Sequence, residues 1–220
     1  MEATAARRPD GRFEREPATE TGEPRTIASM AIADPAPLGL AAFALTTFVL
    51  SFFNAKIVSA PAEPVVLAVA LAYGGIAQIL AGMWEFRNGN TFGATAFTSF
   101  GAFWLSLWVL DEFLVHSIPK AALGDALGLY LVSWGVFTAY MWVASLRTSV
   151  AVSLVFLLLT ATFALLGIGN WTATSGLITA GGWVGIATAA VAWYASFAGV
   201  TNSTFGRTIL PVKPLNPMRG

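Results

Sequence analysis

The chain of 220 residues is 56% hydrophobic and only 11% charged, and its 12 basic residues balance its 12 acidic ones. Soluble globular domains carry roughly 25% charged residues, so this composition indicates a protein that lies in a lipid bilayer. The absence of cysteine excludes disulfides, zinc–thiolate sites and iron–sulfur clusters, and the single histidine, His116, cannot form a metal site alone. Basic residues form no stripe outside the two ends, so we expect no nucleic-acid partner.

Residues 1–33 are polar, and they mix acidic residues with arginines where a secretory signal peptide would have an apolar run. This composition predicts a disordered N-terminal tail on the cytoplasmic side, without a cleavable signal. We predict a transmembrane domain over residues 34–205 and a cytoplasmic C-terminal tail over residues 206–220.

Six apolar stretches follow the N-terminal tail. Each is about long enough to cross a ~30 Å hydrocarbon core as a helix, which needs roughly 20 residues. Strands are disfavoured because stretches this continuous would leave no polar face for the inside of a barrel. The predicted helices run over Pro35–Lys56, Pro64–Phe86, Thr91–Leu110, Ala121–Leu146, Thr148–Ile168 and Ser175–Gly199. The predicted fold class is an all-α integral membrane protein with six transmembrane helices.

Basic residues near the helix ends predict the orientation of the six helices. Arg87 and Arg147 fall on the side of the two tails, whereas Lys56 and Lys120 fall on the other side. Since positively charged loops tend to stay in the cytoplasm, we predict a multi-pass protein of the plasma (inner) membrane with both termini cytoplasmic. Trp104 falls near a predicted helix end, where an indole ring typically anchors a protein at the membrane interface.

A weak internal repeat relates the first, third and fifth predicted helices. Phe43, Phe100 and Leu159 recur in them at nearly equal intervals, each in a segment rich in Thr, Ala and bulky apolar residues. Such a repeat predicts three helix pairs arranged with pseudo-three-fold symmetry around a central pathway. The alternative is coincidence, because any six apolar helices yield some similar spacing.

Uncharged hydrogen-bonding side chains are the main polar groups within the predicted helices, and no Lys or Arg falls at mid-depth. The missing lysine excludes a retinal Schiff base, and no nucleophile–base pair or metal cluster favours an enzyme. We therefore expect no catalytic residue, no metal and no cofactor. Most membrane threonines simply bond to their own helix. The candidate pathway-lining residues are Thr46, Thr47, Gln78, Thr98 and Asn170.

Glu85 is the one carboxylate inside the second predicted apolar stretch. A lone intramembrane acid is by default a functional candidate, because its burial is costly. Glu85 also lies near the interface, where it could pair with Arg87 or Arg147. The sequence alone favours this structural role.

Several segments of the chain resemble the acetate uptake transporters, also called succinate–acetate permeases. The resemblance rests on “DPAPLGL” (Asp34–Leu40), “GGIAQILAGMWEFRNGNTFGATAFTSFGAFWLS” (Gly74–Ser106), “TFALLGIGN” (Thr162–Asn170), “AWYAS” (Ala192–Ser196) and “FGRTILPV” (Phe205–Val212). It extends from about Asp34 to Val212, so we expect the N-terminal tail to lie outside it.

The resemblance implies a homohexamer of six-helix subunits that takes up acetate and related short carboxylates, including succinate. It also implies a pathway in each subunit, narrowed midway by a Phe, a Tyr and a Leu. These fall on Phe43, Phe100 and Leu159. Phe100 departs from the family because it lacks the hydroxyl, which leaves one donor fewer for a dicarboxylate. Asp34 stands where the family has Asn, and since both cap helices well, we expect a mild effect.

The expected function is a membrane transporter for acetate and related short carboxylates, with succinate as a further candidate. Carrying a bare carboxylate through an apolar constriction costs several kcal/mol, so we expect a proton to travel with the substrate. The expected partners are therefore the small carboxylate, the proton, the lipid bilayer and further copies of the chain. Two alternatives stay open: a channel for small neutral solutes such as ammonia or urea, and a sensor or scaffold with a relic pore.

Overall fold

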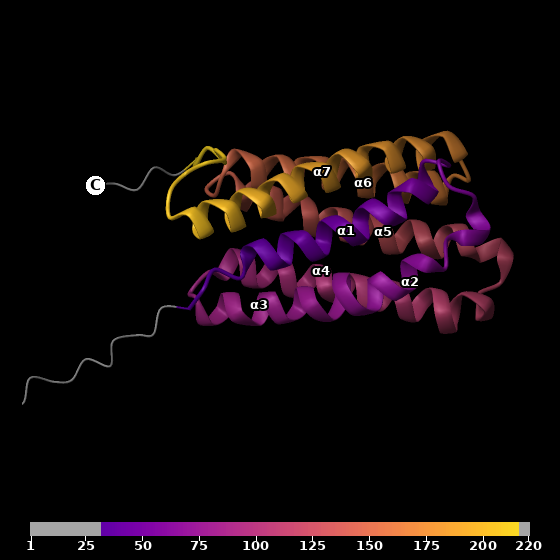
Figure 1. Ribbon diagram of the computed structural model, residues 1–220. Coiled ribbons are helices and arrows are strands. Elements are labelled where there is room, and N and C mark those ends of the chain that lie inside the picture. The colour runs from indigo at the N-terminus through magenta and orange to yellow at the C-terminus, as the bar shows by residue number, and fades with distance from the viewer. Residues whose placement is uncertain (1–31, 216–220) are drawn as a thin grey trace, which may run out of the picture. The chain divides into compact units, whose positions relative to one another are not determined.

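The computed structural model describes residues 32–215, and the described chain is helical (Figure 1). The predicted N-terminal tail, apart from its last two residues, and the end of the C-terminal tail lie outside the described residues. Within the described residues, 6 helices are long and apolar enough to cross a membrane. They run over Ala36–Asn54, Ala60–Arg87, Thr91–Ser117, Lys120–Ser145, Val150–Trp171 and Ser175–Phe205. The six predicted helices are thus confirmed, although the third and sixth extend further than predicted.

Local chemistry sets several of the helix ends. Helix α1 (Ala36–Asn54) begins after Asp34, whose carboxylate Oδ1 accepts a hydrogen bond of 2.9 Å from the backbone N–H of Ala36. The capping role expected for Asp34 is therefore present. Helix α4 (Thr91–Val109) is capped by Asn90, whose side-chain oxygen accepts from the N–H of Gly93 at 3.0 Å. These side chains satisfy N–H groups that have no partner in the first helical turn.

The second and third spans each contain a wider, π-helical segment. In the second span, α2 (Val65–Val69) continues into a π-helical segment at Ala70–Ala77 and then into α3 (Gln78–Arg87). In the third span, α4 continues into a π-helical segment at Leu110–Leu114 and a final 3₁₀ turn. Such segments rotate the side chains that follow them and often mark functional regions of membrane helices. The third span is longer than predicted because of this extension.

The helices follow one another around a central axis. Helix α1 packs against the second span and against α7 (Ser175–Phe205), while α3 packs against α4. Helix α6 (Val150–Trp171) lies between α5 (Lys120–Ser145) and α7. Helices α1, α4 and α6 begin the three sequential pairs, and buried side chains from all three meet in one central cluster. The three odd spans thus meet at the centre, but α4 packs more closely on α3 than on α5, the second helix of its predicted pair.

Helices α4 and α5 come together mainly through aromatic side chains. Phe103 of α4 stacks on Tyr130 of α5 at 5.8 Å between ring centroids. Trp134 of α5 meets Phe103 at 5.3 Å and Phe100 at 6.3 Å. Large rings therefore fill the space where the two backbones lie further apart, and they form one wall of the centre of the bundle.

Close contact between the first two spans depends on a glycine. A Cβ atom built on Gly74 would lie 2.7 Å from the hydroxyl oxygen of Thr46. The Thr46 hydroxyl itself donates to the carbonyl of Ala42 at 2.9 Å. Small residues at such positions allow membrane helices to approach closely, so Gly74 fixes the side of α1 that faces the second span.

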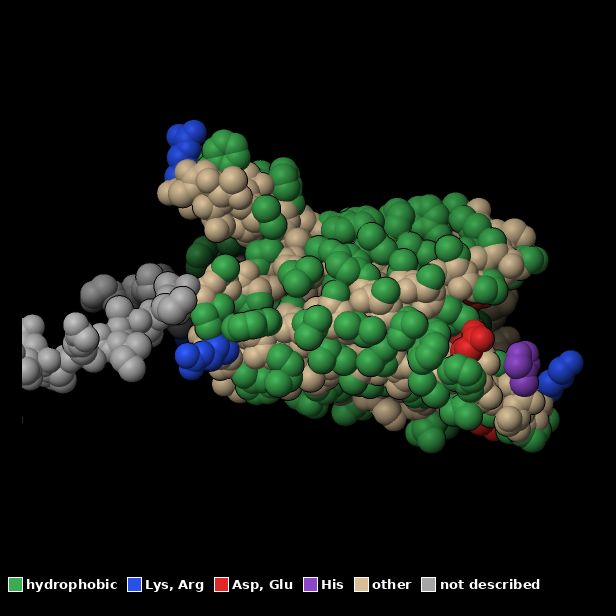
Figure 2. Space-filling model, turned by 60° about the horizontal axis from the view of Figure 1, so that its bottom comes forward, with side chains coloured by type: hydrophobic (Ala, Val, Ile, Leu, Met, Phe, Trp, Pro, Cys, Tyr) green, Lys and Arg blue, Asp and Glu red, His purple; other side chains and the backbone are tan. Residues whose placement is uncertain are grey.

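The surface of the bundle matches a membrane-spanning protein. Figure 2 shows a face that is largely hydrophobic, with Lys and Arg gathered at its two ends and acidic side chains near one end. Large apolar residues such as Phe197, Val136 and Val143 are exposed on the outside of the helices. Exposed side chains of this kind are favourable in lipid and unfavourable in water.

The described part of the C-terminal segment packs back onto the bundle. Helix α7 ends at Phe205, and Gly206 adopts the left-handed conformation (φ 63°) that commonly ends helices. The side-chain oxygen of Asn202 then accepts from the backbone N–H groups of Ile209 and Leu210 at 2.7 and 2.9 Å. Further on, the carbonyl of Lys213 accepts from Val150 at 2.9 Å. Up to residue 215 the segment is therefore fastened to α6 and α7.

Replacing Asn202 with alanine is expected to loosen this segment. Loss of its hydrogen bonds costs about 1–2 kcal/mol locally, which raises the open population roughly tenfold. Limited trypsin digestion of the detergent-solubilised protein measures the change as faster cleavage after Arg207, which Thr208 follows. Ser203→Ala, an exposed neighbour on α7, is the matched control. Equal cleavage rates in the two variants would contradict the role of Asn202.

Candidate functional site

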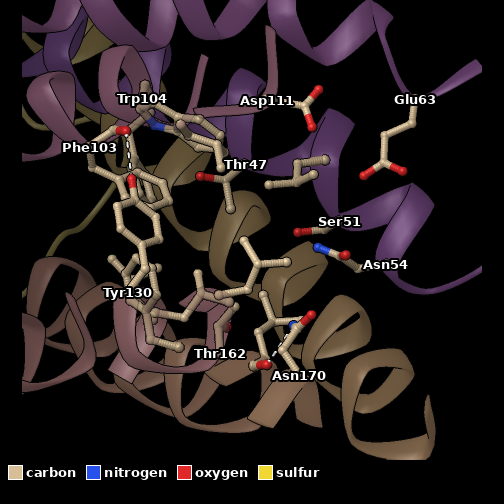
Figure 3. Close-up of a pocket in the computed structure, with 18 residues that line it drawn as sticks. Thr47, Ser51, Asn54, Glu63, Phe103, Trp104, Asp111, Tyr130, Thr162 and Asn170 are labelled. Carbon is tan, nitrogen blue, oxygen red and sulfur yellow. Dashed lines mark hydrogen bonds between the residues drawn. The ribbon is translucent and has the colours of Figure 1, made fainter. Parts of the chain in front are cut away.

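A cavity of about 210 Å³ lies at the centre of the helix bundle (Figure 3). Its lining comes from three helices that begin the sequential pairs, α1, α4 and α6, together with α5 and the second span. The α1 residues Phe43, Thr47, Ser51 and Asn54 recur every three or four positions, so they form one face of that helix. The cavity therefore follows α1 from its middle to its end.

The mouth of the cavity lies at the bundle end opposite to Asp34. Asn54 is the last residue of α1, and Asn170 is close to the end of α6. Two acidic residues, Glu63 and Asp111, also line this part of the cavity. None of the described residues that line the cavity is Lys or Arg. The mouth of the cavity is therefore lined by polar side chains, and the charged residues among them are acidic.

The inner part of the cavity is apolar and closes on residues predicted for the constriction. Phe43 and Leu159 both line it, and both are buried. Phe100 is also buried but is not among the lining residues; its ring lies 5.7 Å from that of Phe43, centroid to centroid. The three side chains belong to the same central hydrophobic cluster. The structure thus brings them together, with Phe100 next to the floor of the cavity.

Two hydrogen-bonding groups in the cavity wall have no partner in the protein. Thr47, from α1, is 6% exposed, and Trp104, from α4, is 2% exposed. Neither the Thr47 hydroxyl nor the Trp104 indole N–H bonds to another described residue. In Figure 3 the Thr47 side chain lies next to Trp104, whereas Glu63 and Asp111 lie toward another part of the cavity. Buried polar groups are rarely left unpaired, so two in one cavity wall suggest a polar ligand or water there.

Three other polar side chains in the wall hydrogen-bond within the protein. The Thr162 hydroxyl donates to the carbonyl of Leu158 at 2.9 Å. The amide nitrogen of Asn170 donates to the carbonyl of Leu166 at 2.8 Å. Tyr130 shares a hydrogen bond of 2.7 Å with Ser106. Among the buried donors of the described lining residues, the Thr47 hydroxyl and the Trp104 indole N–H are the two that have no partner in the protein.

The remaining candidate residues lie outside the lining of this cavity. Thr46 bonds within α1 and faces the second span, as described above. Gln78 and Thr98 are at the contact between the second span and α4, where a Cβ on Gly82 would meet the Thr98 side chain. The side-chain oxygens of Gln78 and Thr98 are buried without a partner. A role of these three residues in the pathway stays a prediction.

Trp104 was expected at the membrane interface, and this expectation is wrong. The ring is buried in the central cluster, because the third span continues beyond Leu110 to Ser117 and places Trp104 well inside the helix. Trp104 follows Phe100 by one helical turn on the same face of α4. That spacing was the available signal, and it also places Phe103 and Leu107 on the cavity side.

The fold and the cavity together define a multi-pass membrane protein with a solute-sized cavity at the centre of its helices. The sequence matches the GPR1/FUN34/yaaH family over residues 18–216, and the chain belongs to this family. The match begins ahead of Asp34, so the expectation that the whole N-terminal tail lies outside the resemblance is wrong.

Three relatives place the chain within that family. It is 44% identical over 186 residues to the “Succinate-acetate/proton symporter SatP” of Escherichia coli strain K12, a match that covers 82% of this chain and 95% of the relative. It is also 44% identical over 176 residues to “Ammonia transport outward protein 2” of Saccharomyces cerevisiae, covering 76% of this chain and 61% of that protein. A solved structure described as “Structure of the bacterial acetate channel SatP” superposes with a TM-score of 0.77 at 42% identity, covering 82% of this chain and 99% of the other.

Proposed function

We propose that this protein transports acetate and related short carboxylates, succinate among them, across the plasma (inner) membrane together with a proton. The observation that carries the proposal is the central cavity, which has free hydroxyl and indole N–H donors above an apolar floor and no Lys or Arg among the described residues that line it. Neutral donors suit a small carboxylate or its acid. The names of the E. coli relative and of the similar solved structure support the same substrate class.

The apolar floor supports proton coupling. A carboxylate that passes Phe43, Phe100 and Leu159 has to leave the donors of the cavity, and no positive charge compensates for it there. Desolvating an unpaired charge costs several kcal/mol or more, whereas the protonated acid crosses at far lower cost. In this proposal the three side chains form the constriction, and the proton masks the charge at that point.

The positions of the basic residues support an orientation with both termini in the cytoplasm. Arg87, the last residue of α3, and Arg147, in the turn after α5, lie at the end of the bundle where α1 begins, and Lys56 and Lys120 lie at the other end. In this orientation the cavity mouth with Glu63 opens away from the cytoplasm.

We further infer a homohexamer from the resemblance described above. The oligomeric state is tested by measuring the mass of the detergent-solubilised complex, for example by native mass spectrometry.

Uptake of labelled acetate into proteoliposomes tests the proposed function. An inward proton gradient is expected to drive accumulation of acetate inside the vesicles, and collapse of the gradient with a protonophore is expected to abolish it. Empty liposomes measure the leak of acetic acid through lipid. An acetate flux that ignored pH and followed the membrane voltage alone would contradict proton coupling.

A channel for small neutral solutes is the second candidate function. The uncharged inner cavity suits ammonia or urea, and the name of the S. cerevisiae relative supports ammonia. Competition separates the two candidates: excess propionate is expected to inhibit labelled acetate uptake, and excess urea or methylammonium is not. The reverse result would favour the neutral-solute channel.

A further inference from the structure

Glu85 is the only charged residue that is fully buried in the described part of the chain, with 0% of its surface exposed. It lies in α3, near the end of the second span where Arg87 and Asn88 follow. Neither of its carboxylate oxygens makes a hydrogen bond of good geometry among the described residues, and the polar groups beside it are the uncharged amides of Asn90 and Asn88. Arg87 and Arg147 are both exposed, so the structural pairing that the sequence favoured is not present. A buried acid without a partner calls for another explanation.

The carboxyl group lies against the first turn of α4. A Cβ atom built on Gly93 would lie 2.8 Å from the carboxyl carbon of Glu85 and 2.6 Å from the side-chain nitrogen of Asn90. Glycine at position 93 therefore leaves the space that the carboxyl group occupies. The N-terminal end of a helix carries partial positive charge, which favours an ionised carboxylate placed there.

This position is in line with the predicted constriction. Gly93, Phe97, Phe100 and Trp104 follow one another at spacings of four, three and four, so they form one buried face of α4. Gly93 precedes Phe100 by two turns, or about 10 Å along the helix axis. Trp104 lies on the cavity side of Phe100, and Glu85 lies on the opposite side. Glu85 thus lies on the cytoplasmic side of the constriction in the proposed orientation, about two helical turns from Phe100.

The groups around Glu85 leave its charge free to change. Asp34, ahead of α1, is the acidic neighbour that acts on it electrostatically, and the side-chain amides of Asn90 and Asn88 lie close enough to interact with its carboxyl group. Arg87 is two residues away on the same helix, a spacing at which side chains do not face each other. A side chain in an ion pair must break that pair to take up a proton, whereas Glu85 has none to break.

We infer that Glu85 receives the proton of the transported acid on the cytoplasmic side of the constriction. The inference rests on the proposed function. The O–H bond of the carboxylic acid breaks, its proton passes to a carboxylate oxygen of Glu85, and the substrate leaves as its anion. Glu85 then releases the proton to cytoplasmic water and returns to its carboxylate form. The proton and the anion therefore cross the constriction together as the acid, and they leave the protein separately on the cytoplasmic side.

The variant Glu85→Gln tests the inference, because it keeps the size of the side chain and cannot carry the proton. Two assays on proteoliposomes are compared: accumulation of labelled acetate driven by a proton gradient, and exchange of labelled for unlabelled acetate at equal pH on both sides. Exchange requires no net proton transfer. We expect accumulation to fall at least tenfold in Glu85→Gln while exchange continues. We expect the variant Glu112→Gln, which changes an exposed acid in the π-helical segment Leu110–Leu114, to behave as the parent protein in both assays.

Two further variants guard against a merely structural effect. Glu85→Asp keeps the acid on a shorter side chain and is expected to restore part of the accumulation, with a changed dependence on pH. Gly93→Ala keeps Glu85 but displaces its carboxyl group, and it is expected to reduce accumulation more than exchange. Accumulation by Glu85→Gln that equals the parent at every pH would overturn the inference, and so would equal loss of both activities in all three variants. Failure of the parent protein to transport acetate would instead refute the proposed function.

Discussion

Replacing Phe43 with alanine is expected to admit carboxylates wider than acetate, raising the uptake of benzoate at least tenfold relative to acetate. Phe43 lines the inner end of the cavity and its ring packs against that of Phe100 at 5.7 Å. Truncation removes the ring from the floor and leaves a void that its neighbours fill only partly. A barrier lower by about 1.4 kcal/mol for the wider substrate gives a tenfold higher rate.

The control for this variant is another phenylalanine of the same helix. Phe48 packs against Phe52 and Trp193, with ring centroids 4.3 and 4.9 Å away, and it does not line the cavity. Phe48→Ala removes an equal volume but is expected to leave the ratio of benzoate to acetate unchanged. Phe43→Leu, which fills more of the void, is expected to give an intermediate ratio. Unchanged selectivity in both Phe43 variants would contradict a constriction at this side chain.

The six helices and the three central side chains could be predicted from the sequence for physical reasons. A lipid environment requires about 20 apolar residues for each span, so the helices are visible in the composition alone. Phe43, Phe100 and Leu159 recur at nearly equal intervals along the chain, and in the structure they share one buried cluster. Helix ends were less predictable. The π-helical segment at Leu110–Leu114 prolongs the third span through Asp111 and Glu112, two acids at which the hydropathy predicts an end.

The unpaired polar groups of the site could not be predicted, because they depend on the rotation of each helix about its axis. Thr46 and Thr47 are adjacent in sequence but about 100° apart around α1. One therefore faces Gly74 and bonds within its helix, and the other faces the cavity with a free hydroxyl. Trp104 was assigned to the interface for a related reason: its depth depends on how far the third span continues. The sequence shows that Glu85 is an acid within an apolar stretch, but it does not show that Arg87 and Arg147 fail to pair with it.

The second large effect is expected from the two free donors in the cavity wall. In Thr47→Val the side chain keeps its shape and loses the hydroxyl. In Trp104→Phe an aromatic side chain remains, but it is smaller and lacks the indole N–H. A hydrogen bond to a charged group contributes about 1.5–3 kcal/mol, so each variant is expected to lower acetate uptake at sub-saturating concentration roughly tenfold. The loss should appear mainly in the acetate concentration that half-saturates transport, because the donors hold the substrate before it reaches the constriction.

Matched variants separate substrate contact from packing. Thr160→Val removes a hydroxyl that donates to the carbonyl of Phe156 at 2.8 Å, and Thr160 is outside the cavity lining. Trp108→Phe alters a ring that packs against Phe113 and also lies outside the lining. Both are expected to transport acetate as the parent does. If Thr47→Val and Trp104→Phe left half-saturation unchanged, the substrate could not be held by these donors. If each lowered affinity and the double variant lost no more than either single one, the two groups would act on the same carboxylate as a unit, since coupled contacts are not additive.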